Sequence, residues 1–310
     1  MNRIPVWMDC DTGTDDAVAI MLAHKLEEID LLGISTVCGN TVQENSFWNT
    51  HRINELMGTS YPVYRGAEKP MLIPLVTAAY VHGENGLGDV EMPLPEYPDV
   101  KNESAWDALY ACAKDHPHEL RLVPTGPLTN IAIAVTKYPD LPGLLHSITL
   151  MGGSAGPGNI TPAAEFNIYA DPQAADIVFR CGAPIVMCGL DVTTQAYLSM
   201  EDLNELADSG SKAGCFVKAI LMHSFKILQK YGVKGFCMHD SCPVMYLAHP
   251  ELFEGEEAGV VVETRGTITF GKTVTDLYSD KQFPFRNALV LLKLDREKFN
   301  AVLKQAVMSI

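Results

Sequence analysis

Residues 4–28 read IPVWMDCDTGTDDAVAIMLAHKLEE, and this stretch decides the fold. Its opening apolar run is typical of a buried strand. Residues 15–28 place Val18, Leu22 and Leu26 on one helical face, which predicts an amphipathic helix. Because a helix follows the strand at once, the stretch predicts a βαβ unit and therefore a parallel sheet.

The rest of the chain continues this alternation of short apolar strands and amphipathic helices. We expect further strands at 31–38, 62–64, 120–124, 146–151, 184–188, 257–262, 274–278 and 287–294, and further helices at 43–57, 103–115, 127–137, 171–181, 213–230 and 296–308. This order is typical of an α/β fold with a mostly parallel central sheet flanked by helices, as in Rossmann-like proteins. No internal repeat or linker divides the chain, so we expect a single domain over residues 1–310.

Composition excludes several classes of protein. The 310 residues include 23 Lys and Arg against 38 Asp and Glu, which gives a formal net charge of −15. Surfaces that bind nucleic acids or anionic membranes need a basic footprint, so neither partner is expected. No run of about 18 uncharged apolar residues predicts a transmembrane helix. The amino terminus MNRIPVWMDCD lacks the features of a signal peptide, and we expect a cytoplasmic protein.

The eight cysteines are scattered and mostly lie in apolar segments, such as the one that ends at Cys38. No C-x-x-C spacing occurs, which makes a zinc cluster the weaker interpretation. We therefore expect buried reduced thiols. Two segments are irregular, 66–99 and 152–162, with many prolines and glycines. Each is interpreted either as a binding loop or lid or as a surface excursion, and the sequence leaves this choice open.

The densest chemical signal lies where the first strand ends. Residues 9–16 read DCDTGTDD, with four carboxylates, and ligands bind open parallel sheets at the carboxyl ends of the strands. Clustered anions need a cation or hydrogen-bond donors, and oxygen ligands favour Ca²⁺ or Mg²⁺. Asp15 and Asp16 also suit the first turn of a helix, where acids offset the macrodipole. That explanation does not cover Asp9 and Asp11, so we predict a cation site.

Known motifs with similar spacing do not fit this run. An EF-hand counted from Asp9 would need Asp or Asn at Gly13, Gly at Thr14 and Glu at Ile20. The D-x-D-x-T pattern of haloacid-dehalogenase-like phosphatases would need Thr at position 13, where Gly13 stands. No phosphate-binding G-x-x-x-x-G-K-[ST] loop occurs.

Two further segments carry polar side chains suited to a site. His239 and Asp240 follow a glycine-containing approach, where the Asp is suited to ligate a distant cation and the His to act as an acid or base. Alone, such a pair is usually structural. The segment 156–175 holds Asn159, Glu165 and Asn167, side chains of the types that bind sugar hydroxyls. The Asp-Pro pair at 171–172 within it is explained as a helix cap and first turn.

The chain resembles the inosine-uridine-preferring nucleoside hydrolases. The matching pieces run in order along the sequence: DCDTGTDDAVAI (9–20), CGN (38–40), VHGENGLG (81–88), VPTGPLTNIA (123–132), LMGG (150–153), GNITPAAEFNIYADPQAA (158–175) and HD (239–240). Taken together, these pieces are far more specific than any one of them.

The resemblance implies a Ca²⁺-dependent hydrolysis of the N-glycosidic bond of ribonucleosides to ribose and free base, with a role in nucleoside salvage. It implies that Asp11, Asp16, Asp240 and the carbonyl of Thr125 hold one Ca²⁺; that Asp11 is the general base on a Ca²⁺-bound water; that His239 protonates the leaving base; that Asp15, Asn40, Asn159, Glu165 and Asn167 bind ribose; that His82 lies near the base; and that Asp9 supports the ligands from behind. It also implies a homodimer or homotetramer. Many members of the family carry His or Leu where this chain has Thr14.

Two other functions stay open at this point. The first is a D-x-D-type Mg²⁺-dependent phosphatase, against which Gly13 argues. The second is a non-catalytic nucleoside or sugar sensor on the same fold, against which the complete acidic set argues. Base preference also stays open: Gln229 and Tyr231 are candidates to face the base, and Ile227, where some pyrimidine-preferring relatives carry a polar residue, weakens a strict pyrimidine preference. A carboxylate-lined pocket is expected to repel the phosphate of a nucleotide.

Overall fold

The first predicted strand lies inside a nine-stranded sheet. A computed structural model describes residues 3–96, 98–225 and 234–310. Its sheet contains β1 (Ile4–Cys10), β2 (Ile29–Thr36), β3 (Val63–Arg65), β4 (Arg121–Pro124), β5 (Ser147–Met151), β6 (Ile185–Cys188), β9 (Phe253–Val262), β10 (Thr273–Asp276) and β11 (Ala288–Leu294). A separate pair joins β7 (Tyr197–Leu198) to β8 (Phe236–Cys237).

The order of strands is β10-β9-β11-β6-β5-β4-β1-β2-β3. Neighbours from β11 to β3 are parallel, whereas β9 is antiparallel to both β10 and β11. The prediction of a mostly parallel sheet is therefore confirmed. After β1 the chain builds outward to β2 and β3, then returns to place β4 on the other side of β1. This reversal is the topological switch point, where open α/β sheets bind their ligands.

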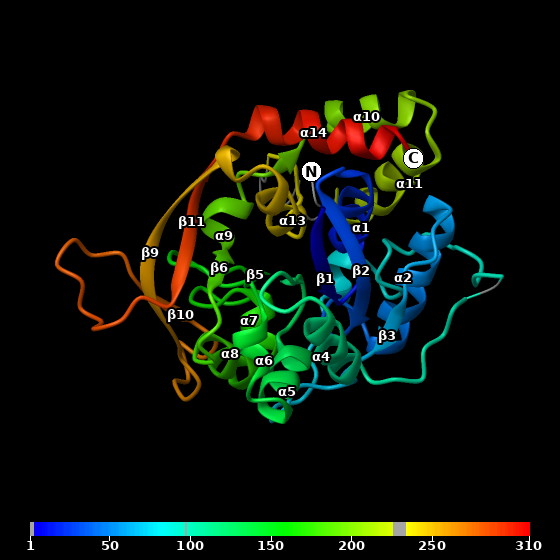
Figure 1. Cartoon of the computed structure of the whole chain (residues 1–310). Coiled ribbons are helices and arrows are strands. Elements are labelled where there is room, and N and C mark those ends of the chain that lie inside the picture. Colours follow the sequence, from blue (N-terminus) through cyan, green and yellow to red (C-terminus); the bar gives the residue numbers. More distant parts are fainter. Residues whose placement is uncertain (1–2, 97, 226–233) are drawn as a thin grey trace.

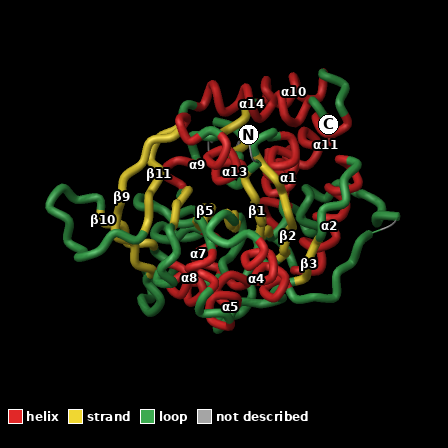
Figure 2. Tube along the Cα trace, in the orientation of Figure 1, coloured by secondary structure: helices red, strands yellow, loops and turns green. Residues whose placement is uncertain are grey.

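Helices cover both faces of the sheet (Figures 1 and 2). The helices are α1 (Thr14–Lys25), α2 (Gln43–Met57), α3 (Ala79–His82), α4 (Ala105–Asp115), α5 (Thr129–Lys137), α6 (Leu141–Leu144), α7 (Phe166–Ala170), α8 (Pro172–Phe179), α9 (Leu190–Thr193), α10 (Met200–Asp208), α11 (Lys212–Leu221), α13 (Ser241–Ala248) and α14 (Arg296–Met308), with 3₁₀ turns Met222–Ser224 and Pro250–Leu252. One layer contains α1, α10, α11, α13 and α14, and the opposite layer contains α4, α5, α6 and α8.

Alternation along β1 divides the core between these two layers. Val6 and Met8 belong to the apolar cluster under α1, whereas Trp7 faces the cluster under α4 and α5. Helix α1 is buried over almost its whole length, from Thr14 to Ala23. The prediction of a single apolar face on this helix was therefore too narrow, because α13 and α14 pack against it as a second layer above the sheet.

Most predicted elements are present, with ends shifted by a few residues. The predicted helix at 213–230 is the main correction: α11 ends at Leu221, a 3₁₀ turn follows, and residues 226–230 lie outside the described part. Helix α10 was not predicted, although Ser199 and Asp202 form a capping box at its start.

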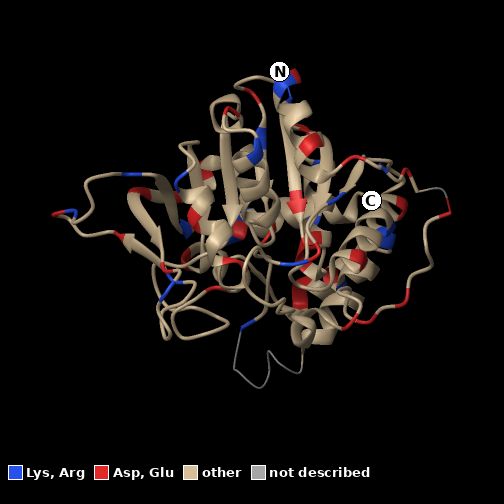
Figure 3. Ribbon diagram, turned by 90° about the horizontal axis from the view of Figure 1, so that it is seen from below, with Lys and Arg blue, Asp and Glu red and all other residues tan. Residues whose placement is uncertain are grey.

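The outer surface carries the charge in a mixed pattern. Acidic side chains lie along several helices and loops with Lys and Arg interspersed (Figure 3). Within the described residues, no helix has the length and apolar character needed to cross a bilayer. The eight cysteines are free thiols, and four of them are fully buried.

Candidate active site

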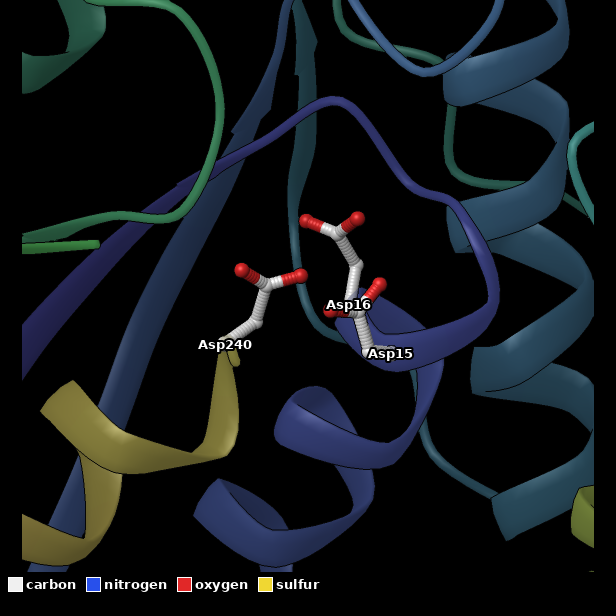
Figure 4. A group of neighbouring side chains, drawn as sticks. All are labelled: Asp15, Asp16 and Asp240. Atoms are coloured by element: carbon white, nitrogen blue, oxygen red, sulfur yellow. The ribbon is translucent and has the colours of Figure 1, made fainter. Parts of the chain in front are cut away.

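Three carboxylates converge from two segments that are far apart in sequence. Asp15 and Asp16 lie in the first turn of α1, and Asp240 is the residue that precedes α13. One ligand oxygen from each lies within 4.8 Å of the other two, and Figure 4 shows the three carboxylates directed toward one another. All three residues are buried. The packing of α13 on α1 is what brings Asp240 to this place.

Asp11 lies beside this cluster, in the turn between β1 and α1. Its Oδ2 accepts a hydrogen bond from the backbone N–H of Asn40 at 2.6 Å, and its Oδ1 accepts one from Asn40 Nδ2 at 3.2 Å. Two glycines press on the carboxylate: a Cβ at Gly39 would come 2.1 Å from Oδ2, and one at Gly126 would come 2.9 Å from Oδ1. The turns after β2 and β4 thus hold Asp11 in place.

Asp16 is held by three donors from three parts of the chain. Its Oδ2 accepts hydrogen bonds from the backbone N–H of Gly13 at 2.8 Å and from Asn40 Nδ2 at 3.0 Å. Its Oδ1 accepts from the hydroxyl of Thr125 at 2.7 Å. Asn40 therefore bridges Asp11 and Asp16, and the strand ends β1, β2 and β4 meet at these two acids.

Burial dominates the electrostatics of the pocket. It raises the pKa of Asp15 to about 7, and the charge of Asp16 adds to the rise. It also raises the pKa of Asp11 and Asp240 well above their usual range, with neighbouring carboxylates contributing. Without a cation, such a set resists full ionisation because four anions would share a low-dielectric space.

The donor set fits a hard cation. Every side-chain group that converges here offers oxygen, and Asp15 Oδ1 is buried without a hydrogen-bond partner among the described residues. An orphaned carboxylate oxygen in a cluster of raised pKa is the arrangement that a divalent cation stabilises. No lysine or arginine is hydrogen-bonded or ion-paired to these carboxylates in the described part of the chain.

Asp9 lies behind the pocket on β1. Its Oδ1 accepts hydrogen bonds from Asn130 Nδ2 at 2.7 Å and from the hydroxyl of Ser35. Burial outweighs these two donors and raises the pKa of Asp9 to about 7. Sequence reasoning did not find Asn130, although it lies on α5 within the same VPTGPLTNIA segment as Thr125.

The segment 159–167 forms another wall. Glu165 caps α7: its Oε2 accepts from the N–H groups of Gly153 and Ile168, and its Oε1 accepts from that of Asn167. Asn167 donates through Nδ2 to the carbonyl of Thr125 at 2.7 Å, which ties α7 to the turn after β4.

Asn159 differs from these two residues. It is exposed, and its Oδ1 accepts from the N–H of Phe166 at 2.9 Å. No hydrogen bond joins Asn159 to the acidic cluster within the described residues.

Two histidines approach from opposite sides. His82 ends α3, and its Nδ1 lies 3.9 Å from Asp15 Oδ1. His239 is half-buried, and its Nδ1 lies 2.8 Å from the hydroxyl of Thr193, a partner that sequence reasoning missed. Burial lowers the pKa of His82 to about 3 and that of His239 to about 4, so both rings are neutral at pH 7. The candidate base contacts Gln229 and Tyr231, like Ile227, lie outside the described residues.

Comparisons with known proteins agree on one family. The profile of "Inosine-uridine preferring nucleoside hydrolase" matches residues 6–301. Two relatives are named pyrimidine-specific ribonucleoside hydrolase RihA: that of Photobacterium profundum is 41% identical, with 96% of each chain covered, and that of a Shewanella species (strain ANA-3) is 42% identical, with 96% and 94% covered.

A solved structure supports the same assignment. The "Purine-Preferring Ribonucleoside Hydrolase from Gardnerella vaginalis" superposes with a TM-score of 0.92 over 98% of both chains, at 33% sequence identity. The relatives and this structure differ in the base that their names give.

Proposed function

The chain belongs to the inosine-uridine-preferring nucleoside hydrolase family and is a ribonucleoside hydrolase; from this premise we propose how its pocket cleaves the N-glycosidic bond. The observation that carries the proposal is the convergence of Asp11, Asp16 and Asp240 at the switch point of the sheet. Asp11 is proposed as the general base, and the other acids as groups that hold the cation or the sugar.

The proposed cation is Ca²⁺, held by Asp11, Asp16, Asp240 and the carbonyl oxygen of Thr125. The oxygen-only donors, the raised pKa values and the orphaned oxygen of Asp15 support a hard divalent ion. When bound, such an ion offsets the carboxylate charge, provides a place for water and lowers the pKa of that water. We assign Asp15 to a ribose hydroxyl rather than to the ion.

Asp11 takes a proton from the attacking water as the N-glycosidic bond breaks. Its carboxylate is fixed by two donors of Asn40 and by the close packing of Gly39 and Gly126, so it meets the water in one orientation. The sugar passes through an oxocarbenium-like transition state. A positioned general base typically contributes about 10²–10⁴-fold in rate.

Polar side chains of the α7 segment hold the ribose in this proposal. Asn167 has its Nδ2 occupied by the Thr125 carbonyl, which leaves Oδ1 to accept from a sugar hydroxyl. Glu165 has one oxygen that accepts only one backbone N–H, so that oxygen can take a hydroxyl as well. Asn40 and Asn159 complete the set. Contacts made away from the reacting carbon supply binding energy that favours a strained sugar pucker.

His239 is the proposed donor to the leaving base. The ring is neutral, so donation requires its proton on Nε2, and the Thr193 hydroxyl at Nδ1 favours that tautomer when it donates. A base that accepts this hydrogen bond leaves with less negative charge.

Pyrimidine ribonucleosides are the proposed preferred substrates. The support is the name of two relatives at 41% and 42% identity, against 33% for the purine-preferring structure. The test is a panel of kcat/KM values for uridine, cytidine, inosine, adenosine and guanosine, measured by release of reducing sugar with Ca²⁺ present. We expect the pyrimidine nucleosides to lead by at least about tenfold, or 1.4 kcal/mol.

Two outcomes of this panel would contradict the proposal. Inosine as the best substrate would overturn the pyrimidine preference alone. Tight binding of ribonucleosides without turnover would favour a sensor and overturn the catalytic roles. Uridine 5′-monophosphate is the matched control, because an acidic pocket without a paired Lys or Arg should reject its phosphate.

A further inference from the structure

Thr14 touches His82 through two different atoms. Its backbone N–H donates to His82 Nδ1 at 3.2 Å, and its hydroxyl oxygen lies 3.0 Å from the same nitrogen. Thr14 is the first residue of α1, so its N–H is one of the helix-start donors that have no partner within the helix. Thr14 and His82 are both buried.

The backbone contact determines the tautomer of His82. An amide N–H only donates, so Nδ1 must offer its lone pair and cannot carry a proton while the contact lasts. The hydroxyl of Thr14 then shares that lone pair as a second donor. The proton of the neutral ring consequently sits on Nε2. The 3.9 Å approach of Nδ1 to Asp15 is therefore not an ion pair.

The ring is held where a substrate would meet it. Gly13 makes room for it, since a Cβ there would come 2.7 Å from His82 Nδ1. The side chain keeps 11% of its surface exposed, and Nε2 has no hydrogen-bond partner among the described residues. We propose that Thr14 is a positioning residue that fixes His82 as the Nε2–H tautomer and so presents one hydrogen-bond donor to an acceptor atom of the nucleoside.

This inference rests on the proposed function for its substrate but not for its structural part. It also gives a role to the position where many family members carry His or Leu. Leucine keeps the backbone donor at this position but has no hydroxyl, so the second donor to His82 is particular to a Thr or Ser here. The hydroxyl and the amide can be separated by mutation because only the hydroxyl belongs to the side chain.

The first test reads the tautomer directly, without substrate. In protein labelled with ¹⁵N-histidine, NMR shifts of Nδ1 and Nε2 at pH 7 distinguish the two neutral tautomers. We expect the His82 signal, assigned by its loss in His82→Gln or, should that variant not fold, in His82→Asn, to report a proton on Nε2. A proton on Nδ1, or on both nitrogens, would overturn the proposal whatever the enzyme hydrolyses.

The second test uses kinetics on the best ribonucleoside. Thr14→Val keeps the shape and the backbone N–H but removes the hydroxyl, so kcat/KM should fall about 3- to 10-fold, the usual range for one lost hydrogen bond. The loss should lie mainly in KM, because His82 contacts bound substrate before and during the reaction. Thr14→Ser restores the donor and should keep at least half of the wild-type kcat/KM. Thr267→Val, on an exposed turn, is the matched control.

A double-mutant cycle separates positioning from general packing. If Thr14 acts through His82, then Thr14→Val should cost nothing further in a His82→Gln background. Additive losses, or equal losses in Thr14→Ser and Thr14→Val, would overturn the proposal. If the wild-type protein hydrolyses no ribonucleoside, the proposed function fails, and the NMR result still decides the tautomer.

Discussion

The acidic pocket and the helix layer of α4, α5 and α8 bury carboxylates in opposite ways. In the helix layer, fully buried Asp171 accepts hydrogen bonds from the N–H groups of Met71 and Ala174 and from the hydroxyl of Thr129. In the pocket, Asp15 keeps an oxygen without any partner among the described residues, and other carboxylates lie beside it.

The difference separates structural acids from functional ones. Asp171 is stabilised by neutral donors, caps α8 and ties the segment at Met71 to the helix layer, so nothing is missing around it. Asp15, Asp16 and Asp240 face one another, and burial raises the pKa of each. A buried acid whose surroundings supply too few donors indicates a ligand that is absent from the protein itself.

The largest effect is expected at Asp11. Asp11→Ala should lower kcat by about 10³-fold, because the general base is removed. The protein should stay folded, since the change relieves repulsion among buried carboxylates; circular dichroism and a thermal melt check this. Turnover within tenfold of wild type in a folded variant would remove Asp11 from the role of base. Asp11→Asn, which keeps the shape, should be equally inactive.

Calcium binding should distinguish the two regions next. After treatment with a chelator, wild-type protein should gain about 2.7 kcal/mol of unfolding free energy at a Ca²⁺ concentration 100 times the Kd. Asp240→Asn should lose this gain, because a proposed ligand is removed, whereas Asp171→Asn should keep it. Thermal shifts with and without Ca²⁺ measure both. The same gain in Asp240→Asn would place the ion elsewhere.

In the helix layer, stability rather than activity should respond. Asp171→Ala leaves two backbone N–H groups and the Thr129 hydroxyl without their acceptor and removes a helix cap, so we expect a loss of about 2 kcal/mol in unfolding free energy. Asp176→Ala is the matched control on α8, where only an i,i+4 pair with Arg180 is lost. Urea titration measures both, and equal losses would contradict the distinction.

Sequence patterns were sufficient where local signals and topology agree. The β1–α1 unit and its acids follow from an apolar run, a turn and a helical period, and a parallel sheet places their junction at the ligand edge. The approach of Asp240 to Asp15 depends on how α13 packs on α1, and without the family resemblance no local pattern contains that contact.

Other features were beyond sequence reasoning for separate reasons. The partnership of His239 with Thr193 joins segments 46 residues apart, and neither residue type specifies the other. The predicted helix at 213–230 has a continuous apolar period, yet the α-helix ends at Leu221 in a 3₁₀ turn, a local choice that periodicity does not encode. Helix α10 did carry a signal, in its Ser199–Asp202 capping box.

The smallest effect concerns an acid that lies at the surface of the helix layer. Asp107 accepts hydrogen bonds from Lys137 and Tyr138, and these donors lower its pKa to about 2, the reverse of the shift in the pocket. Since the folded pKa lies below the model value of 3.8, its contribution is present above that pH and is lost as the pH falls toward 2.

With 34% of its side chain exposed, Asp107 should contribute at most about 1 kcal/mol. Asp107→Asn should therefore lower the unfolding free energy at pH 7 by less than that amount, and the difference from wild type should vanish near pH 2 in acid titrations followed by circular dichroism. Asp140→Asn, which removes only a contact with Tyr110, is the control. A difference that grew on acidification would mean that Asp107 is destabilised by its surroundings, as the pocket acids are, and would erase the contrast between the two regions.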